Sequence, residues 1–187
     1  MENIETHPFE PFVPESPKIL IMGTFPPQPK RWSMTFYYPN WTNDFWRICG
    51  LIFYDDKDHF CNIPEKTFRL DEIKEFLCER HIAMSDTGRE AVRLKDNASD
   101  KFLDIRKTID IRGFLDNYPT LTDLVTTGEK AAQVIAELTG TEAPKMGEYT
   151  EFDYTGRRVR HWRMPSTSRA YPSPLSAKAA LYARVLH

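Results

Sequence analysis

Two short segments, each closed by a glycine, most constrain the fold of this chain. Residues 18–22 read Lys-Ile-Leu-Ile-Met and are followed by Gly23, and the segment 121–127 is followed by Gly128. The first is a short continuous apolar run, which is typical of a strand buried on both faces of a parallel sheet. We therefore expect both segments to be strands of one sheet. Ligands of such sheets bind beyond the C-terminal ends of the strands, which directs attention to the loops there.

Segments with helical spacing alternate with these strands. Thr42 or Asn43 can cap one helix, and further helices are predicted over residues 71–79, within 101–117, over 129–138 and over 176–186. Residues 81–85 predict a strand, residues 149–154 and 157–164 a hairpin, and the polar residues 86–100 a surface loop or irregular connection. The pattern predicts an α/β fold. We expect a three-layer αβα sandwich with a central, mostly parallel four-stranded sheet, in one domain over residues 1–187.

Composition excludes several classes of protein. The chain has 187 residues, of which 41% are hydrophobic, and no apolar run approaches the ~20 residues that span a membrane. The first 17 residues carry four acids and no base, which is unlike a signal peptide, so we expect a cytoplasmic protein without a membrane partner. We also expect a monomer. Cys49, Cys61 and Cys78 form no Cys-x-x-Cys pair, and we expect reduced thiols and not a disulfide frame, a zinc site or an iron-sulfur site.

The net charge of −2 hides an uneven distribution. Residues 16–43 contain three basic residues and no acid, and residues 154–187 contain seven basic residues and no acid. If the fold brings the two segments together, they form one positive face suited to nucleic acid. The alternative is that the C-terminal helix simply has a solvated basic face.

The most distinctive chemistry lies in residues 36–47, which contain six aromatic rings together with Asn43 and Arg47. Aromatic faces hold flat ligands by stacking, and an amide both donates and accepts hydrogen bonds. This combination suits a pocket for a planar heterocycle such as a nucleobase. The loops 23–27 and 164–168 follow predicted strands and offer glycine, hydroxyl groups and backbone donors to the same ligand.

Four segments together resemble the uracil-DNA glycosylase superfamily, most closely its hypoxanthine-DNA glycosylase and mismatch-specific branch. They are Gly23-Thr-Phe-Pro-Pro27, Phe36-Tyr-Tyr-Pro39, Asn43-Asp-Phe-Trp-Arg47 and Met164-Pro-Ser-Thr-Ser168. The resemblance implies a monofunctional DNA repair glycosylase. Such an enzyme flips a deaminated base, uracil or hypoxanthine, out of DNA and hydrolyses its N-glycosidic bond with water, without metal or cofactor. The implied partner is DNA that contains a deaminated or mismatched base.

The resemblance also implies roles for individual residues. Asn43 is the catalytic residue and orients water, because an amide is a poor proton acceptor. The implied base-binding residues are Gly23, Thr24, Phe25, Tyr37, Tyr38 and Ser166. The implied DNA-binding residues are Thr167, Ser168, Arg169 and Lys178. Asp44 does not match a functional position of the family, and its expected role is that of a negative residue in the first turn of a helix.

The chain departs from the family pattern in both loops. Many members carry an acidic residue or Asn in the first loop, where this chain has Thr24, Phe25 and Pro26. Many also carry His at the position of Met164. A second register for the last motif, residues 171–176, would make Leu175 the wedge that fills the gap left by a flipped base. We prefer the first register because Met164 ends a predicted strand.

Two rival functions remain open from the sequence. The first is a non-catalytic DNA- or nucleotide-binding module on the same fold, favoured by the two missing family residues. The second is a hydrolase of free nucleosides, which predicts little dependence on DNA. Binding of DNA without turnover distinguishes the first rival, and a weak salt dependence of DNA affinity distinguishes the second.

Overall fold

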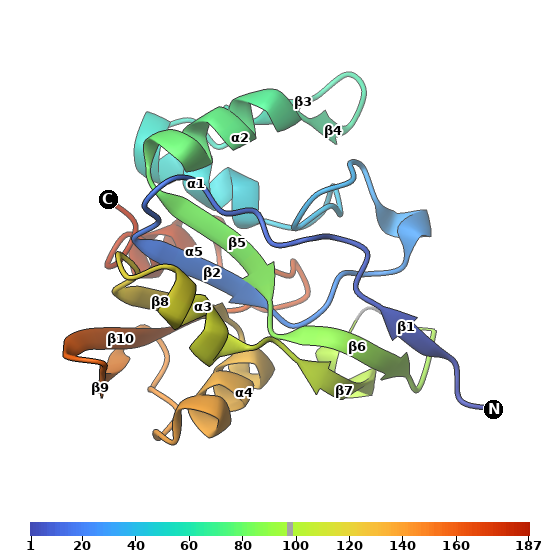
Figure 1. The fold of residues 1–187 in the computed structure, drawn as a ribbon. Helices are drawn as coiled ribbons and strands as arrows, with labels where there is room; N and C mark the ends of the chain where they lie inside the picture. The colour runs from blue at the N-terminus through green and yellow to red at the C-terminus, as the bar shows by residue number, and fades with distance from the viewer. Residues whose placement is uncertain (97–98) are drawn as a thin grey trace.

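A five-stranded sheet forms the centre of the protein (Figure 1), which a computed structural model describes over residues 1–96 and 99–187. In spatial order its strands are β5 (Ile82–Asp86), β2 (Ile19–Gly23), β8 (Asp123–Thr127), β10 (Arg157–Met164) and β9 (Tyr149–Tyr154). The first four strands run parallel to their neighbours, whereas β9 is antiparallel to β10. The carboxyl ends of the four parallel strands therefore lie at one edge of the sheet.

The predicted α/β class is confirmed, but the expected number of four strands is wrong. The fifth strand, β9, comes from the hairpin that the sequence indicates. Thr155 and Gly156 connect β9 to β10 and have φ angles of 46° and 85°. Two residues with positive φ make a turn whose twist matches that of the flanking strands. The turn therefore returns the chain directly beside itself, and β9 extends the sheet as an antiparallel edge strand.

Helices cover both faces of the sheet. In Figure 1, α1 (Phe45–Tyr54) and α2 (Leu70–Glu79) lie above the sheet, and α4 (Glu129–Thr139) lies below it. The apolar side chains that α1, α2 and α5 (Leu175–Tyr182) bury pack with Ile21 and Val125 of the sheet. Those of α3 (Ile111–Asn117) and α4 pack with Leu20 and Leu124. Because neighbouring residues of one strand point to opposite faces, the two apolar strands supply both cores of a three-layer sandwich.

A second sheet lies beyond the C-terminal end of β5. It consists of β1 (Ile4–Thr6), β6 (Gly88–Arg93) and β7 (Leu103–Thr108) in the order β1-β6-β7, with both pairs antiparallel. The prediction of a loop over residues 86–100 is therefore wrong for most of its length. The charges that suggested a loop pair across the strands instead, as Arg93 does with Glu5 at 2.9 Å. Such pairs stabilise neighbouring strands.

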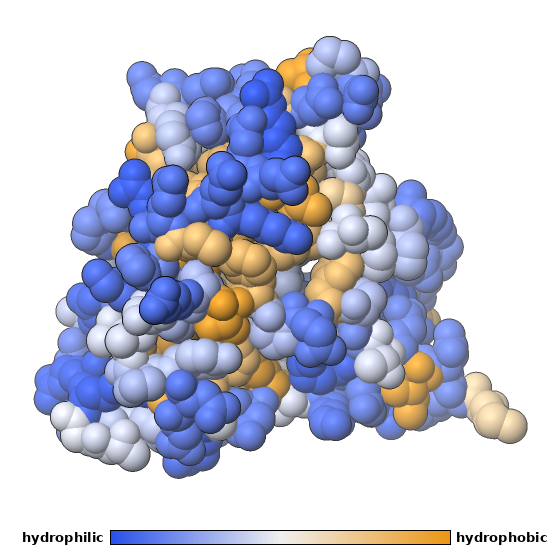
Figure 2. All heavy atoms as spheres, turned by 45° about the horizontal axis from the view of Figure 1, so that its top comes forward, coloured by the Kyte–Doolittle hydropathy of each residue, from blue (hydrophilic) through white to orange (hydrophobic). Residues whose placement is uncertain are grey.

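The remaining elements are short connections. They are η1 (Pro29–Arg31), β3 (Cys61–Asn62), β4 (Thr67–Phe68) and η2 (Asp100–Phe102). Hydrophilic residues cover most of the face shown in Figure 2, and hydrophobic residues reach its surface mainly in the middle. Within the described residues, no helix combines the length and the apolar character that crossing a bilayer demands.

Candidate functional site

A pocket opens beyond the C-terminal ends of the parallel strands. Its cavity has a volume of about 130 Å³. Gly23, Asn43 and Ser166 all line it. The structure thus brings together the three loops that the sequence singled out, one after β2, one before α1 and one after β10.

Gly23 lies where several polar groups of the pocket converge. A Cβ atom at this position would lie 3.0 Å from Oδ1 of Asp86, 3.3 Å from the Tyr38 hydroxyl and 3.4 Å from Oγ1 of Thr127. The first distance is too short for a side chain to fit without displacing the carboxylate. Glycine therefore fits here without shifting its protein neighbours, and it leaves the backbone open to the close approach of a ligand.

The Asp86 carboxylate forms part of the pocket wall and is held by two N–H groups. It ends β5, is only 6% exposed, and accepts a hydrogen bond from the Gly23 amide at 3.1 Å through Oδ1. Nε2 of His7 lies 2.7 Å from Oδ2. The Phe9 amide donates to Nδ1 of the same imidazole at 3.0 Å. Since Nδ1 must then carry a lone pair, the proton of the neutral ring lies on Nε2 and is donated to Asp86.

A second carboxylate, that of Asp100, lines the same pocket beside the first loop. Its Oδ2 accepts a hydrogen bond from the Thr24 hydroxyl at 2.9 Å. Lys130 of α4 donates to the backbone carbonyls of Asp100 and Leu103, which fixes the chain here. Burial raises the pKa of the Asp100 carboxyl above its ordinary value, and the nearby Asp86 adds to the rise. Thr24 and Lys130 oppose it by stabilising the charged form.

The first loop is held rigidly against the start of β6. The carbonyl groups of Gly23 and Thr24 accept hydrogen bonds from the amides of Thr87 and Gly88, at 2.8 and 2.9 Å. The Arg93 guanidinium donates to the Pro26 carbonyl at 2.6 Å. The pocket wall is therefore set by backbone contacts between two segments that lie far apart in the sequence.

The two polar atoms of the Asn43 side-chain amide, Oδ1 and Nδ2, differ in their hydrogen bonds to the described residues. Its Oδ1 accepts a hydrogen bond from the Phe45 amide at 2.9 Å, in the turn that leads into α1. The partner is a donor, so the orientation of the side-chain amide is fixed, and Nδ2 has no protein partner among the described residues. Arg47 donates to the carbonyls of Asn43 and Trp41, at 3.0 and 2.8 Å. Asn43 therefore offers a positioned N–H donor to a ligand or a water molecule.

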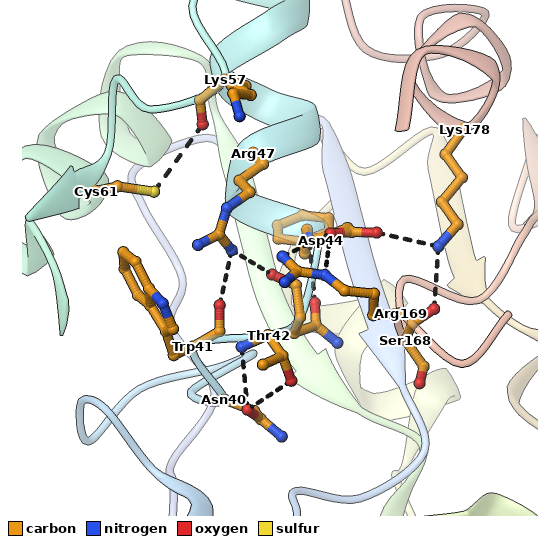
Figure 3. Close-up of polar contacts among 12 residues, drawn as sticks. Asn40, Trp41, Thr42, Asp44, Arg47, Lys57, Cys61, Ser168, Arg169 and Lys178 are labelled. Carbon is orange, nitrogen blue, oxygen red and sulfur yellow. Dashed lines mark hydrogen bonds and ion pairs between the residues drawn. The ribbon is translucent and has the colours of Figure 1, made fainter. Parts of the chain in front are cut away.

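Asp44, which follows Asn43 in the chain, binds Lys178 of α5 and Arg169 of the last loop (Figure 3). Its amide donates to the Thr167 carbonyl at 2.9 Å, and its carboxylate contacts Nζ of Lys178 at 3.1 Å and the Arg169 guanidinium at 3.3 Å. Asp44 is 6% exposed and Lys178 only 1% exposed. The expectation that Lys178 contacts DNA phosphate is therefore corrected, because this ammonium group is buried in an ion pair. Arg169 remains half exposed, with 53% of its side chain accessible.

The aromatic residues of segment 36–47 divide between the pocket and the core. Tyr38 lines the pocket, stacks on Phe45 at 4.3 Å between ring centroids, and shares a hydrogen bond of 2.8 Å with Thr127. Its φ of 53° lies in the left-handed region, which costs a non-glycine residue roughly 1–2 kcal/mol. Tyr37 is 1% exposed and donates to the Glu10 carbonyl, away from the pocket. The prediction that Tyr37 contacts the base is corrected, because the hydrophobic core holds its ring.

Phe25 of the first loop also lines the pocket. Its ring meets His7 edge to face, with the centroids 5.3 Å apart, and packs against Ala91 and Leu103. Phe25 and Tyr38 are thus the two aromatic side chains of the pocket, and each is supported from behind by other rings or apolar groups.

The last loop supplies Ser166, Thr167 and Ser168 to the pocket. The Ser168 amide donates to Oγ of Ser166 at 3.2 Å, and Thr167 is buried. Met164 ends β10, as the preferred register requires. Leu175, the wedge of the second register, begins α5 and is partly buried against the core.

The acid-free segment 154–187 does not form one free positive face. Most of its basic side chains already bind acidic groups or backbone carbonyls of the protein. Arg158 pairs with Glu151, Arg160 with Asp123, and Arg157 with carbonyls at the end of α3. Most basic residues of this segment therefore stabilise contacts within the protein.

Sequence reasoning did not identify His7, Asp86 or Asp100 as residues of the site. The sequence prediction placed Asp86 in a polar loop. Only one serine separates it from the apolar residues Ile82, Ala83 and Met84. An acid that closes a buried strand is a detectable signal at this edge of a sheet. No comparable signal marks His7, whose contact with Asp86 joins residues 79 positions apart.

The arrangement of acids and histidines does not suggest a metal centre. Over the described ranges 1–96 and 99–187, no group of three or more His, Cys, Asp or Glu side chains is placed to hold a metal ion.

Comparisons with known proteins bear on the fold. No family model and no curated protein matches the sequence. The structure is similar to the solution NMR structure of a protein from Methanosarcina acetivorans that is provisionally assigned as a uracil DNA glycosylase. The TM-score is 0.61 at 20% sequence identity, and the match covers 99% of this chain and 100% of that chain. Similarity at this identity establishes a shared fold, and the hypoxanthine branch stays a prediction.

Proposed function

We propose that this protein is a DNA glycosylase that removes a deaminated base, uracil or hypoxanthine, from DNA by hydrolysis of the N-glycosidic bond. The observation that carries the proposal is the convergence of Gly23, Asn43 and Ser166 in one pocket together with two aromatic rings and two carboxylates. The fold shared with a provisionally assigned uracil DNA glycosylase supports it.

The pocket suits a base that has left the DNA stack. Phe25 and Tyr38 offer aromatic surface to a flat ring, and the rigid loops at Gly23 and Ser166 offer backbone and hydroxyl groups to its edge. Burial raises the pKa of the Tyr38 hydroxyl, and Asp86 adds to the rise, so this group stays a neutral phenol. The site thus accepts a planar heterocycle without placing a phenolate against it.

The polar groups of the pocket suit the charges that develop as the bond breaks. Loss of a base leaves positive charge on the sugar, as in other glycosidic hydrolyses. The Asp86 carboxylate, fixed by the Gly23 amide and His7, supplies a negative charge that does not need to reorganise. Asn43 presents its Nδ2–H group to the attacking water and orients it.

The test is release of the base from synthetic DNA. Duplex and single-stranded oligonucleotides that contain uracil, hypoxanthine or xanthine are incubated with excess protein, and abasic sites are then cleaved with alkali. We expect release from at least one of them, and absence of release from all of them by folded protein contradicts the proposal. Binding of these duplexes without release would instead identify a non-catalytic binding module.

Replacement of Asn43 tests the mechanism within the same assay. We expect Asn43→Ala to lower the single-turnover rate by on the order of 10²-fold while DNA binding persists, because the oriented donor to water is lost. Asn40→Ala is the matched control, since Asn40 also lines the pocket and its side-chain Oδ1 accepts hydrogen bonds from the amide and hydroxyl of Thr42. Equal rates for Asn43→Ala and the wild type would remove Asn43 from the mechanism.

A further inference from the structure

The first loop lacks the acidic residue that could take a proton from water, and the structure places a carboxylate from elsewhere beside it. Thr24 occupies the loop, and its hydroxyl donates to Oδ2 of Asp100 at 2.9 Å. Asp100 begins η2, 76 residues further along the chain, and lines the same pocket as Asn43. The side chain of Thr24 thus positions an acid in the pocket that the loop itself does not encode.

We propose that Asp100 is the general base of this site. The inference rests on the proposed glycosylase function. Asn43 holds the attacking water by donation from Nδ2, and a water oriented by a donor needs a separate acceptor for its proton. Asp100 supplies that acceptor from the side of the pocket that carries the first loop.

The proton-transfer step balances without a further reactant. A hydrogen–oxygen bond of water breaks and the proton passes to the Asp100 carboxylate. The water oxygen forms a bond to C1′ of the deoxyribose as the bond from C1′ to the base nitrogen breaks. The electron pair of that bond leaves with the base, and the proton held by Asp100 later neutralises the base anion through solvent.

The hydrogen bonds of the two carboxylates distinguish their roles. Both oxygens of Asp86 already accept a hydrogen bond from an N–H group, one from Gly23 and one from His7. Oδ1 of Asp100 accepts none from the described residues, and no described Lys or Arg forms an ion pair with this carboxylate. Asp86 is therefore a fixed negative charge, whereas Oδ1 of Asp100, which has no hydrogen-bond donor among the described residues, can receive a proton.

The electrostatic surroundings favour the same assignment. The charged groups that act on Asp100 come from two elements, Asp86 of β5 and Lys130 of α4, and the neutral Thr24 hydroxyl donates to it. Burial has the largest effect and raises the pKa of Asp100. A carboxylate with a raised pKa is a better proton acceptor near neutral pH than an ordinary one.

The experiment is the pH dependence of single-turnover base release, on whichever duplex the wild type cleaves. We expect Asp100→Asn to lower the rate by on the order of 10²- to 10³-fold. The rate of this variant should also no longer decline at acid pH, because that decline marks protonation of the general base, Asp100. Thr24→Val removes the hydrogen bond that stabilises the charged carboxylate. We therefore expect its acid decline at higher pH than in the wild type. Asp104→Asn is the matched control, because Asp104 pairs with Arg106 on β7 and does not line the pocket.

The stability of the variant separates catalysis from folding. A carboxyl whose pKa is raised by folding binds its proton more tightly in the folded state. Its contribution to stability therefore falls as pH rises through the interval between the unfolded and the folded pKa. Asp100→Asn has no ionisable group here and so does not lose this stability. We therefore expect the urea midpoint of Asp100→Asn at neutral pH to be no lower than that of the wild type.

The possible outcomes are distinct. A wild type that releases no base contradicts the proposed function itself. If the wild type is active and Asp100→Asn keeps the wild-type rate, the inference about Asp100 is overturned and the proposed function is unaffected. If Asp100→Asn unfolds, the pH dependence of Thr24→Val tests the inference instead. The inference is overturned if the rate of Thr24→Val declines at the same acid pH as that of the wild type.

Discussion

The two sides of the pocket hold their carboxylates in different surroundings. On the side formed by Asn43 and the last loop, Asp44 lies behind the pocket between Lys178 and Arg169. On the side formed by the first loop and β5, Asp86 and Asp100 line the pocket, and neither pairs with a described Lys or Arg. The first carboxylate is neutralised by cations, and the other two are held by N–H and O–H donors.

This difference separates an acid that joins segments of the chain from acids that line the pocket. A carboxylate paired with cations joins segments of the chain and leaves no charge for chemistry. A carboxylate that accepts hydrogen bonds from neutral donors keeps its negative charge and can act on a ligand. Asp44 is also next to Asn43 in sequence, so proximity in the chain would suggest the wrong acid.

The largest effect on stability is expected from the buried cation of the first side. We expect Lys178→Met to lower the free energy of unfolding by about 3 kcal/mol, since it leaves the buried Asp44 carboxylate with the half-exposed Arg169 as its remaining cationic partner. Urea denaturation measures this change. Lys145→Met, on an exposed side chain, should change it by less than about 0.5 kcal/mol. A similar small change for both variants would show that the ion pair does not hold the loops together.

A smaller effect is expected when the neutral donor of the second side is removed. We expect His7→Leu to destabilise the protein by about 2 kcal/mol, because Asp86 keeps only the Gly23 amide as a donor. His7→Gln retains a side-chain N–H and should recover part of the loss. Thermal or urea unfolding of both variants provides the measurement, and equal stability of the two would argue against donation from His7 to Asp86.

The smallest effect is expected at the exposed cation of the first side. Arg169→Gln should cost less than about 1 kcal/mol, because solvent and salt screen a half-exposed guanidinium at 3.3 Å from Asp44. Unfolding at low and high salt should show the difference between wild type and variant shrinking as salt is added. A cost as large as that of Lys178→Met would mean that Arg169, not Lys178, holds Asp44.

The sequence predicted the parts of the site that depend on local pattern. The strands before Gly23 and Gly128, the helix after Asn43 and the hairpin at Thr155 all have signals within a few residues of themselves. The second sheet was missed because its charged residues pair between β1, β6 and β7, which no local pattern records. Asp86 and Asp100 were missed for the same reason, since their roles depend on contacts with Gly23, His7 and Thr24 from distant parts of the chain.

The position of β1 also bears on the order in which the site forms. Ile4 pairs with Val92, so this strand is synthesised long before its partner and cannot dock until β6 exists. Pairings of such large sequence separation are slow, because much chain entropy is lost before the contact forms. Only after this step does His7 reach Asp86. The pairing of β2 with β8 in the central sheet joins residues even further apart, Ile19 with Asp123, so the central sheet and the pocket both depend on contacts between distant parts of the chain.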